Sequence, residues 1–249
     1  MRFPNYYESS TGTLKLGSFA GAPVLLHWGI VVPAALLTSS YWLRGRLLLG
    51  LLAALILFGS ILVHELAHAW FARRFAVPIH EIVIHMLGGF VRFRARPRHR
   101  AEDYIITLAG PVSNLVLAAL VYLVLWLIPP PEPQPIAVWN QYVQGPPLPG
   151  LVGRALPFAL YLNLGLAIVN MIPGFPLDGG RIVFLMIEQR RGGRTASVVV
   201  GVLGMIFASL NLIVFVASAL AGFPVLAPPS FMQNWQVVDD ARGGKAYAF

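Results

Sequence analysis

Residues 47–72 read LLLGLLAALILFGSILVHELAHAWFA, and this stretch decides which class of fold the chain can adopt. It is long enough to cross a bilayer as one helix, because the hydrocarbon core requires about 20 apolar residues. The stretch contains three ionisable side chains, those of His64, Glu65 and His68. Ionisable groups are costly inside a membrane and mark functional sites by default. The stretch therefore predicts a membrane helix with a reactive centre.

The composition also indicates an integral membrane protein. Of the 249 residues, 57% are hydrophobic and 11% are charged, whereas a soluble domain carries about 25% charged residues. The net charge of +8 comes from basic residues spread through the loops between apolar segments, so we expect no nucleic-acid partner. The chain has no cysteine, which excludes disulfides and thiolate metal ligands. Residues 1–20 lack an apolar core, so we expect no cleavable signal peptide.

These features predict an all-α integral membrane fold, a polytopic helical bundle of about five to six spans with a small membrane-associated β-hairpin. The hairpin is expected at Ile82–Ala95, with Gly88 and Gly89 as its two-residue turn. Arg181–Arg191 is too short to span and is expected to be an interfacial helix, and Pro129–Gly150 an extended loop. Hydropathy places five spans, at Val24–Leu43, Leu47–Ala72, Ile105–Ile128, Leu151–Ile172 and Ala196–Ala221.

The chain divides into an intramembrane domain, residues 1–223, and a polar C-terminal tail, residues 224–249. The lipid bilayer is the expected surroundings, and the basic residues indicate the orientation. With residue 1 in the cytoplasm, 13 of the 18 basic residues lie inside, which fits the positive-inside rule. We therefore expect a prokaryotic plasma (inner) membrane protein with its reactive centre toward the cytoplasmic side. The five outside are Arg44, Arg46, Arg154, Arg242 and Lys245.

HELAH, residues 64–68, has the spacing of a zinc-binding helix. His64 and His68 point to one helix face and can bind one zinc ion, with Glu65 beside it as general base. A hydrolytic zinc site needs a third protein ligand. Asp178 is predicted to supply it, because the prolines of NMIPGFPLDGGR (residues 170–181) break the fourth span at the same membrane depth. We expect one zinc ion per chain.

Such a site hydrolyses an amide. Zinc activates water and polarises a carbonyl, and Glu65 would carry the proton from the water to the leaving amine. The location implies a membrane-embedded substrate segment, which must unwind because a helix hides its carbonyls in hydrogen bonds. The exposed edge of the predicted hairpin offers a place to hold the unwound strand by β-augmentation.

At this point the chain resembles the site-2 proteases, a family of intramembrane zinc metalloproteases. The resemblance implies that His64, His68 and Asp178 bind zinc and that Glu65 is the catalytic base. It also implies that Asn114 helps to position the substrate or the developing oxyanion. The motifs that carry it are HELAH at 64–68, AGPVSN at 109–114 and NMIPGFPLDGGR at 170–181, with GSFAGAPVLLHW at 17–28 and GGF at 88–90.

The resemblance further implies a substrate class. The family typically cuts single-pass transmembrane proteins, often after a first cleavage by another protease. Many relatives have six spans, and some carry PDZ or CBS domains. This chain shows five expected spans and a polar tail, with no such domain, so its regulation does not follow from the resemblance.

Each site residue also has a plainer interpretation. Asp178 could instead cap the short helix that follows it, and Glu65 could instead be the structural partner of an arginine. Asn114 could serve only to join helices, and Asn170 is as well explained by supporting the helix break as by contacting substrate. His27 is expected to anchor at the interface.

His80 and His85 flank the hairpin. Edge-strand polarity accounts for them more simply than a second metal site does.

Two further function classes compete with a zinc endopeptidase. A catalytically silent relative would bind and regulate membrane segments, but it has no reason to keep His64, Glu65, His68 and Asp178 together. A metal transporter would need a relay of polar residues toward both faces, whereas here they cluster toward one face. We therefore predict an intramembrane zinc endopeptidase.

Overall fold

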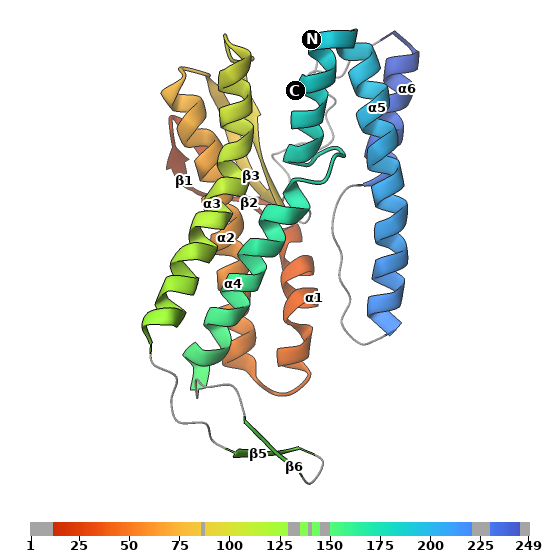
Figure 1. Ribbon diagram of the computed structural model, residues 1–249. Coiled ribbons are helices and arrows are strands. Elements are labelled where there is room, and N and C mark those ends of the chain that lie inside the picture. Colours follow the sequence, from red (N-terminus) through yellow and green to blue (C-terminus); the bar gives the residue numbers. More distant parts are fainter. Residues whose placement is uncertain are drawn as a thin grey trace.

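Long apolar helices form the body of the computed structural model, which describes residues 12–85, 88–128, 135–138, 141–144, 150–220 and 230–244. Helices α2 (Leu47–Arg74), α3 (Arg100–Leu127) and α4 (Gly150–Asn170) pack side by side, and the short α1 (Val31–Trp42) packs on α2 (Figure 1). Helix α3 begins at Arg100 because the Glu102 carboxylate accepts the His99 backbone N–H at 3.2 Å.

The described residues support only part of the expected set of membrane spans. Within the described ranges, three helices are long and apolar enough to cross a membrane: Leu47–Arg74, Arg100–Leu127 and Asp178–Ile213. The expected five to six spans are therefore not confirmed. The first expected span is wrong in its first seven residues, because residues 24–27 lie in strand β2 and Trp28–Ile30 form a 3-10 turn before α1. A short apolar run such as APVLLH fits a buried strand as well as a helix.

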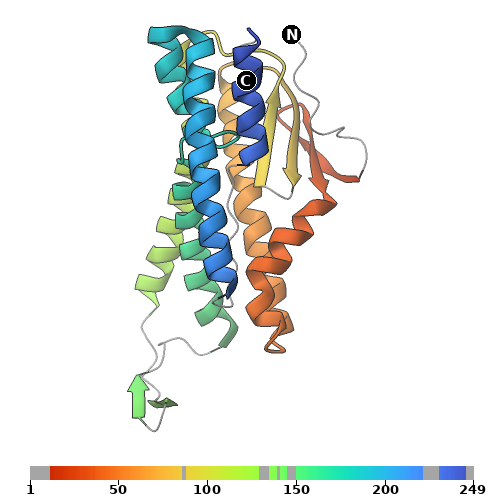
Figure 2. The ribbon, with the colours of Figure 1, turned by 90° about the vertical axis from the view of Figure 1, so that its right-hand side faces the viewer.

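A four-stranded sheet lies beside one end of α2 (Figure 2). Its strands are β1 (Thr13–Phe19), β2 (Ala22–His27), β3 (Ile79–His85) and β4 (Gly88–Phe93), in the order β1-β2-β3-β4. The central pair β2–β3 is parallel and both outer pairs are antiparallel. Sequence reasoning found only β3 and β4.

The turn of the predicted hairpin was placed wrongly. Gly88 and Gly89 are both paired within β4, opposite His85 and Ile84. The connection between β3 and β4 therefore falls at residues 86–87, which lie outside the described residues. Glycine at 89 has a different reason, a close approach to the candidate site described below.

The sheet is fixed to α2 by a common apolar core. Ile82 and Ile84 of β3 are fully buried, and they pack in clusters with residues of α2 such as Ala69, Ala72 and Ile61. Small alanines on this face of α2 allow the sheet to approach closely. The strands are thereby held beside the helix turn that carries HELAH.

Helix α5 (Asp178–Leu220) is a helical hairpin rather than one rod. Gly192 has non-helical backbone angles, with φ 79°, and residues beyond it run back alongside residues 178–191 (Figure 1). The expected short helix at Arg181–Arg191 is thus the first arm of α5, and the expected span at Ala196–Ala221 is its second arm. Only glycine adopts this φ without strain.

Two further segments of regular structure lie outside the expected membrane spans. The extended loop expected at Pro129–Gly150 contains a two-stranded hairpin, β5 (Pro135–Val138) with β6 (Gln141–Gln144), and its remaining residues before Gly150 lie outside the described ranges. The polar tail contains α6 (Phe231–Arg242), which packs on α5. The domain boundary after residue 223 stays a prediction.

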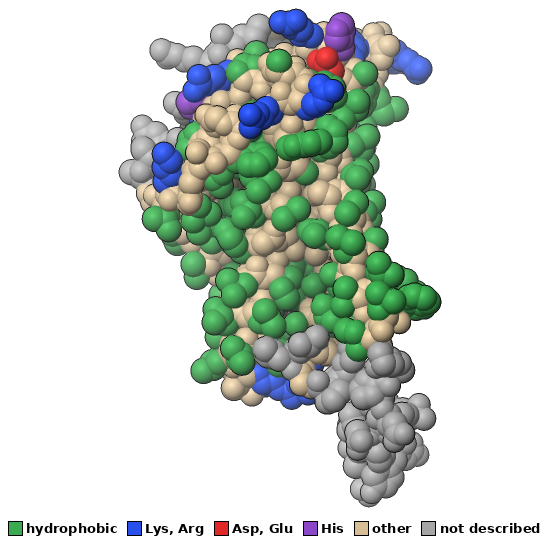
Figure 3. Space-filling model, turned by 90° about the vertical axis from the view of Figure 1, so that its left-hand side faces the viewer, with side chains coloured by type: hydrophobic (Ala, Val, Ile, Leu, Met, Phe, Trp, Pro, Cys, Tyr) green, Lys and Arg blue, Asp and Glu red, His purple; other side chains and the backbone are tan. Residues whose placement is uncertain are grey.

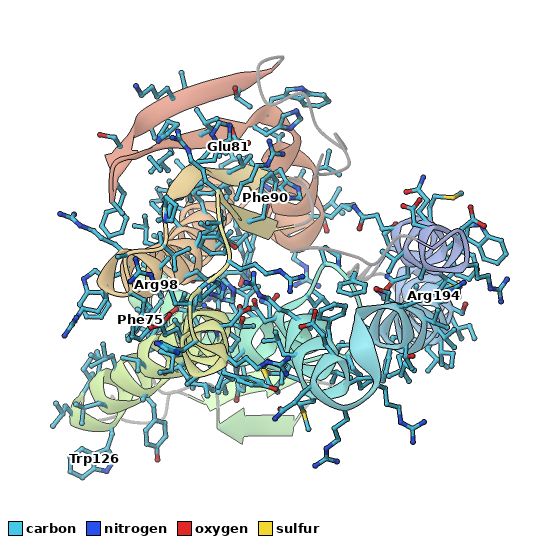
Figure 4. All side chains as sticks on the ribbon, turned by 90° about the horizontal axis from the view of Figure 1, so that it is seen from above. Phe75, Glu81, Phe90, Arg98, Trp126 and Arg194 are labelled. Carbon is cyan, nitrogen blue, oxygen red and sulfur yellow. The ribbon has the colours of Figure 1, made fainter. Side chains whose placement is uncertain are left out.

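The surface of the helices is apolar. Leu48, Leu55, Leu120 and Ile213 are each more than half exposed, and hydrophobic side chains cover the long flank visible in Figure 3. Trp126 lies at the outer edge of the bundle (Figure 4) and is 72% exposed. Such a flank suits lipid, whereas water-soluble monomers rarely expose large apolar patches.

Candidate metal centre

Three side chains converge between α2 and the start of α5. His64 Nε2 lies 3.1 Å from Asp178 Oδ2, His68 Nε2 lies 3.4 Å from Asp178 Oδ1, and the two Nε2 atoms are 3.1 Å apart. Ligand atoms 2.0–2.1 Å from a tetrahedral zinc ion lie about 3.3 Å from one another. The donor set and its spacing therefore fit a zinc site. Both histidines are buried, and Asp178 is half-buried.

Each imidazole is oriented by a second hydrogen bond on its far side. His64 Nδ1 lies 2.6 Å from Asn114 Oδ1, and His68 Nδ1 lies 2.7 Å from the Ile106 carbonyl oxygen. Both oxygens can only accept, so each Nδ1 carries the hydrogen and each Nε2 presents a lone pair. This arrangement is the usual outer support of metal-binding histidines.

Asn114 belongs to a buried polar chain across three helices. Its Nδ2 donates to Asn163 Oδ1 on α4 at 2.9 Å, and Asn163 Nδ2 donates to Ser60 Oγ on α2 at 3.0 Å. All three side chains are buried. Asn114 thus lies behind His64, and the contact with substrate predicted for it remains a prediction. Sequence reasoning missed Asn163 and Ser60, whose only signal was polarity within apolar spans.

Gly110 of α3 leaves room at the ligand atoms. A Cβ at this position would lie 2.3 Å from His68 Nε2 and 2.4 Å from His64 Nε2. These separations are close to zinc–nitrogen bond lengths, so a side chain there would occupy the space that an ion held by both Nε2 atoms would need. AGPVSN was singled out as a motif, but its glycine received no role from the sequence.

The segment that carries Asp178 is packed tightly on itself. A Cβ on Gly179 would lie 2.2 Å from the Met171 carbonyl oxygen, and one on Gly180 would lie 2.6 Å from that of Gly174. The two glycines therefore allow a close backbone approach that any side chain would block. Arg181, in the same turn, donates from Nε to Asp103 Oδ1 of α3 at 2.9 Å, which ties the start of α5 to α3.

Glu65 lies under the backbone of β4. Its side chain is buried, at 4% exposure, and it interacts electrostatically with His64 and Asp178. A Cβ on Gly89 would lie 2.4 Å from Glu65 Cγ and 2.5 Å from Oε1. Glycine at 89 thus lets the outer strand of the sheet pass directly over the expected general base.

The other residues singled out from the sequence lie outside this group. Asn170 is half-buried and donates from Nδ2 to the Leu166 carbonyl oxygen of its own helix at 3.0 Å, so its contact with substrate stays a prediction. His27 Nδ1 accepts the Gly29 N–H at 3.0 Å, which caps the 3-10 turn.

His85 is buried in the sheet beside Phe90. Burial, together with the charge of His27, lowers the pKa of its imidazole to about 4. In the described part of the chain, His64, His68 and Asp178 form the one group of three or more His, Cys, Asp or Glu residues able to hold a metal ion. A second metal site at His80 and His85 is not supported there.

Comparison with known proteins identifies the family of the chain. Residues 52–214 match the family model described as Peptidase family M50. The match covers well over half of the chain, so the chain belongs to Peptidase family M50. The predicted relationship to the site-2 proteases is thereby confirmed.

Two relatives are named as zinc metalloproteases. "Putative zinc metalloprotease Rip3" of Mycobacterium tuberculosis is 29% identical over 230 residues, covering 84% of this chain and 53% of that protein. "Zinc metalloprotease MJ0392" of Methanocaldococcus jannaschii is 23% identical over 222 residues, covering 85% and 59%. The chain spans about half the length of these curated relatives.

A solved structure shares the fold. The "Site-2 Protease from Methanocaldococcus jannaschii" superposes with a TM-score of 0.62 at 19% identity, covering 95% of this chain and 97% of that chain. The mixture of membrane helices and a small sheet is therefore the architecture of this fold, although sequence reasoning expected only a hairpin.

Proposed function

We propose that the chain is an intramembrane zinc endopeptidase that hydrolyses peptide bonds in or near transmembrane segments. The observation that carries the proposal is the convergence of His64, His68 and Asp178 next to buried Glu65, on helices apolar enough to lie in a membrane. Membership of a peptidase family supports it. The intact four-residue set disfavours a catalytically silent relative that binds and regulates membrane segments.

In this proposal the chain's own residues have distinct tasks. His64, His68 and Asp178 hold one zinc ion, whose chemistry is to activate water and polarise a carbonyl. Glu65 accepts the proton of the attacking water and returns it to the leaving amine. Asn114 and the Ile106 carbonyl keep the two imidazoles in the tautomer that leaves Nε2 available.

The proposed substrate is a transmembrane protein, held as an extended strand along β4. This strand is one of the two edge strands of the sheet, and its backbone passes over Glu65 at Gly89. An unwound segment paired with β4 by β-augmentation would bring its amides to the general base. A first cut by another protease and a contact from Asn170 belong to the same proposal.

The proposed location is a prokaryotic plasma membrane, with the metal centre toward the cytoplasmic side. Helix α2 ends in Arg73 and Arg74, close in sequence to His68, and basic side chains gather toward one end of the face seen in Figure 3. The positive-inside rule favours the cytoplasm for that end. The chain has no cysteine, so single cysteines at Arg74 and Arg44 can be labelled from either side to test it.

The activity is tested by co-expressing the chain with a panel of tagged single-pass membrane proteins, intact and pre-trimmed. The matched variant is Glu65→Gln, which keeps the zinc ligands and removes the base. A fragment ending within the membrane segment should form with the parent and not with the variant. Loss of a general base reduces the rate by about 10²–10⁴-fold.

Two outcomes contradict the proposal. Equal fragments from parent and Glu65→Gln would show that Glu65 is not the base. The second outcome has two parts. The parent binds zinc but cleaves none of the intact or pre-trimmed proteins, and Glu65→Gln co-purifies with these proteins no better than the parent does. Together these results would contradict the protease interpretation. Chelation of the metal is the companion control, because it should stop cleavage by the parent.

A further inference from the structure

Helix α6 makes a direct hydrogen-bonded contact with the segment that carries Asp178. The Phe175 N–H donates to Asn234 Oδ1 at 3.0 Å, and Asn234 Nδ2 donates to the Phe175 carbonyl oxygen at 2.7 Å. One side-chain amide thus satisfies both backbone groups of a residue 59 positions away. Phe175 is three residues before Asp178, and α6 lies beyond residues 52–214, the part that matches the family model.

The contact is buried and specific. Asn234 and Phe175 are 0% and 1% exposed. Buried backbone polar groups require hydrogen-bond partners, and Asn234 supplies one to the N–H and one to the carbonyl of Phe175. Phe175 also packs against Phe184 of α5, with ring centroids 6.3 Å apart, and the two share a core cluster with Val237 of α6.

Glycines on α5 bring α6 close enough for this contact. A Cβ on Gly204 would collide with the Asn234 side-chain amide, and one on Gly201 would lie 2.6 Å from Val238 Cγ2. The two positions are three residues apart on one face of the second arm. Helix α6 therefore rests against the backbone of α5, and Asn234 reaches past it to Phe175.

The other end of α6 is also fastened. Arg194 donates from Nε to the Ala241 carbonyl oxygen and from Nη2 to that of Arg242, both at 2.8 Å. Figure 4 places Arg194 where the second arm of α5 meets α6. These bonds satisfy carbonyls that a helix C-terminus leaves without partners. With both ends held, α6 has little freedom to slide along α5.

We infer that α6 is a positioning element of the metal centre, and that Asn234 sets the place of Asp178 through Phe175. The segment from Met171 to Leu177 packs on one side against the first turn of α5 at Gly179 and Gly180. Asn234 of α6 holds the same segment through its hydrogen bonds to Phe175. Asp178 must reach both imidazole Nε2 atoms at once, so a shift of its segment removes one of three ligands. This inference rests on the zinc site of the proposed function.

The experiment compares Asn234→Leu with Val238→Ala. Asn234→Leu keeps a side chain branched at Cγ and removes the hydrogen bonds to Phe175 and to the Ser230 carbonyl oxygen, whereas Val238→Ala loosens the same helix and leaves Phe175 untouched. Asn234→Asp is the milder variant, because it can still accept the Phe175 N–H. Each purified full chain is titrated with zinc against a chromogenic chelator, and with Co²⁺ as a spectroscopic probe. Thermal unfolding of the metal-free chains reports their intrinsic stability.

The expected result is a loss of zinc affinity of about 10–100-fold in Asn234→Leu, the size typical of an outer support of a ligand. Asn234→Asp should fall between Asn234→Leu and the parent. Saturated Co²⁺ spectra of Asn234→Leu should also differ from those of the parent, because the carboxylate ligand is displaced. Val238→Ala should keep the affinity and spectrum of the parent, even if it unfolds at a lower temperature.

Two results overturn the inference, and they are distinguishable. If Asn234→Leu and Asn234→Asp bind zinc as Val238→Ala does, α6 supports the fold alone and the proposed function is unaffected. If the parent itself binds no zinc, the metal site of the proposed function fails, and the inference with it.

Discussion

Replacing Gly110 by alanine puts the metal centre under direct steric test. The new Cβ would lie 2.3 Å from His68 Nε2 and 2.4 Å from His64 Nε2. An ordinary van der Waals contact begins at 3.4 Å, so each imidazole ring would have to move away from the new Cβ by about 1 Å. Zinc sites tolerate about 0.2 Å in their ligand distances. The ion therefore cannot keep both imidazoles in Gly110→Ala.

The expected loss of zinc affinity exceeds that of an outer-support mutation, which is about 10–100-fold. We expect more than about 100-fold, or above about 2.8 kcal/mol. The matched control is Gly59→Ala on α2, where an added Cβ meets nothing within 4 Å. Alanine is the better helix former by about 0.8–1.0 kcal/mol, so this control should bind zinc normally and unfold no earlier than the parent.

The assay is zinc competition with a chelator in detergent, with bound metal counted after dialysis and circular dichroism as the check on folding. A folded Gly110→Ala chain whose zinc affinity stays within tenfold of the parent would refute the reasoning. The imidazoles would then bind metal on a side that Gly110 does not border, or bind none.

Three further perturbations have definite expected outcomes. Asn114→Leu should weaken zinc binding by about 10–100-fold, because His64 Nδ1 loses its acceptor; unchanged competition curves would contradict this. Gly89→Val should abolish cleavage of a membrane substrate and keep the zinc content, because the valine side chain would displace Glu65. The control Gly17→Val in β1 should remain active, because an added Cβ there meets nothing within 4 Å. Burial lowers the pKa of His85 from 6.5 to about 4, so between these two pH values the unfolded chain binds a proton that the folded chain does not. The free energy of unfolding should therefore fall by up to about 1.4 kcal/mol for each pH unit of acidification from pH 6.5 to 4. On acidification across that range, the melting temperature of the parent should fall relative to that of His85→Gln, and an unchanged difference between the two would contradict the lowered pKa of His85.

Local sequence information was sufficient where the chemistry is encoded by spacing. His64 and His68 are one helical turn apart, so any helix over them creates a ligand pair. The prolines before Asp178 indicated a broken helix, and the structure shows Gly179 and Gly180 packed against that break. The convergence of these two segments followed from the expected direction of the spans.

The remainder depended on contacts that the sequence does not encode locally. APVLLH reads equally well as helix or strand, and it is a strand because β3 lies beside it in parallel register. Gly110 has a role only because α3 brings it to the histidines, and Asn163 has one only because α4 brings it to Asn114. Asn234 had no motif, and its partner Phe175 is 59 residues away.

The separation of the ligands along the chain has a consequence for biosynthesis. His64 and Asp178 are 114 positions apart, and chains elongate at about 5–20 residues per second. The histidines are therefore made about 6–23 s before the carboxylate that joins them. During that interval, the two histidines lack their third ligand. Metal loading is accordingly a late event, which follows the synthesis of the first arm of α5.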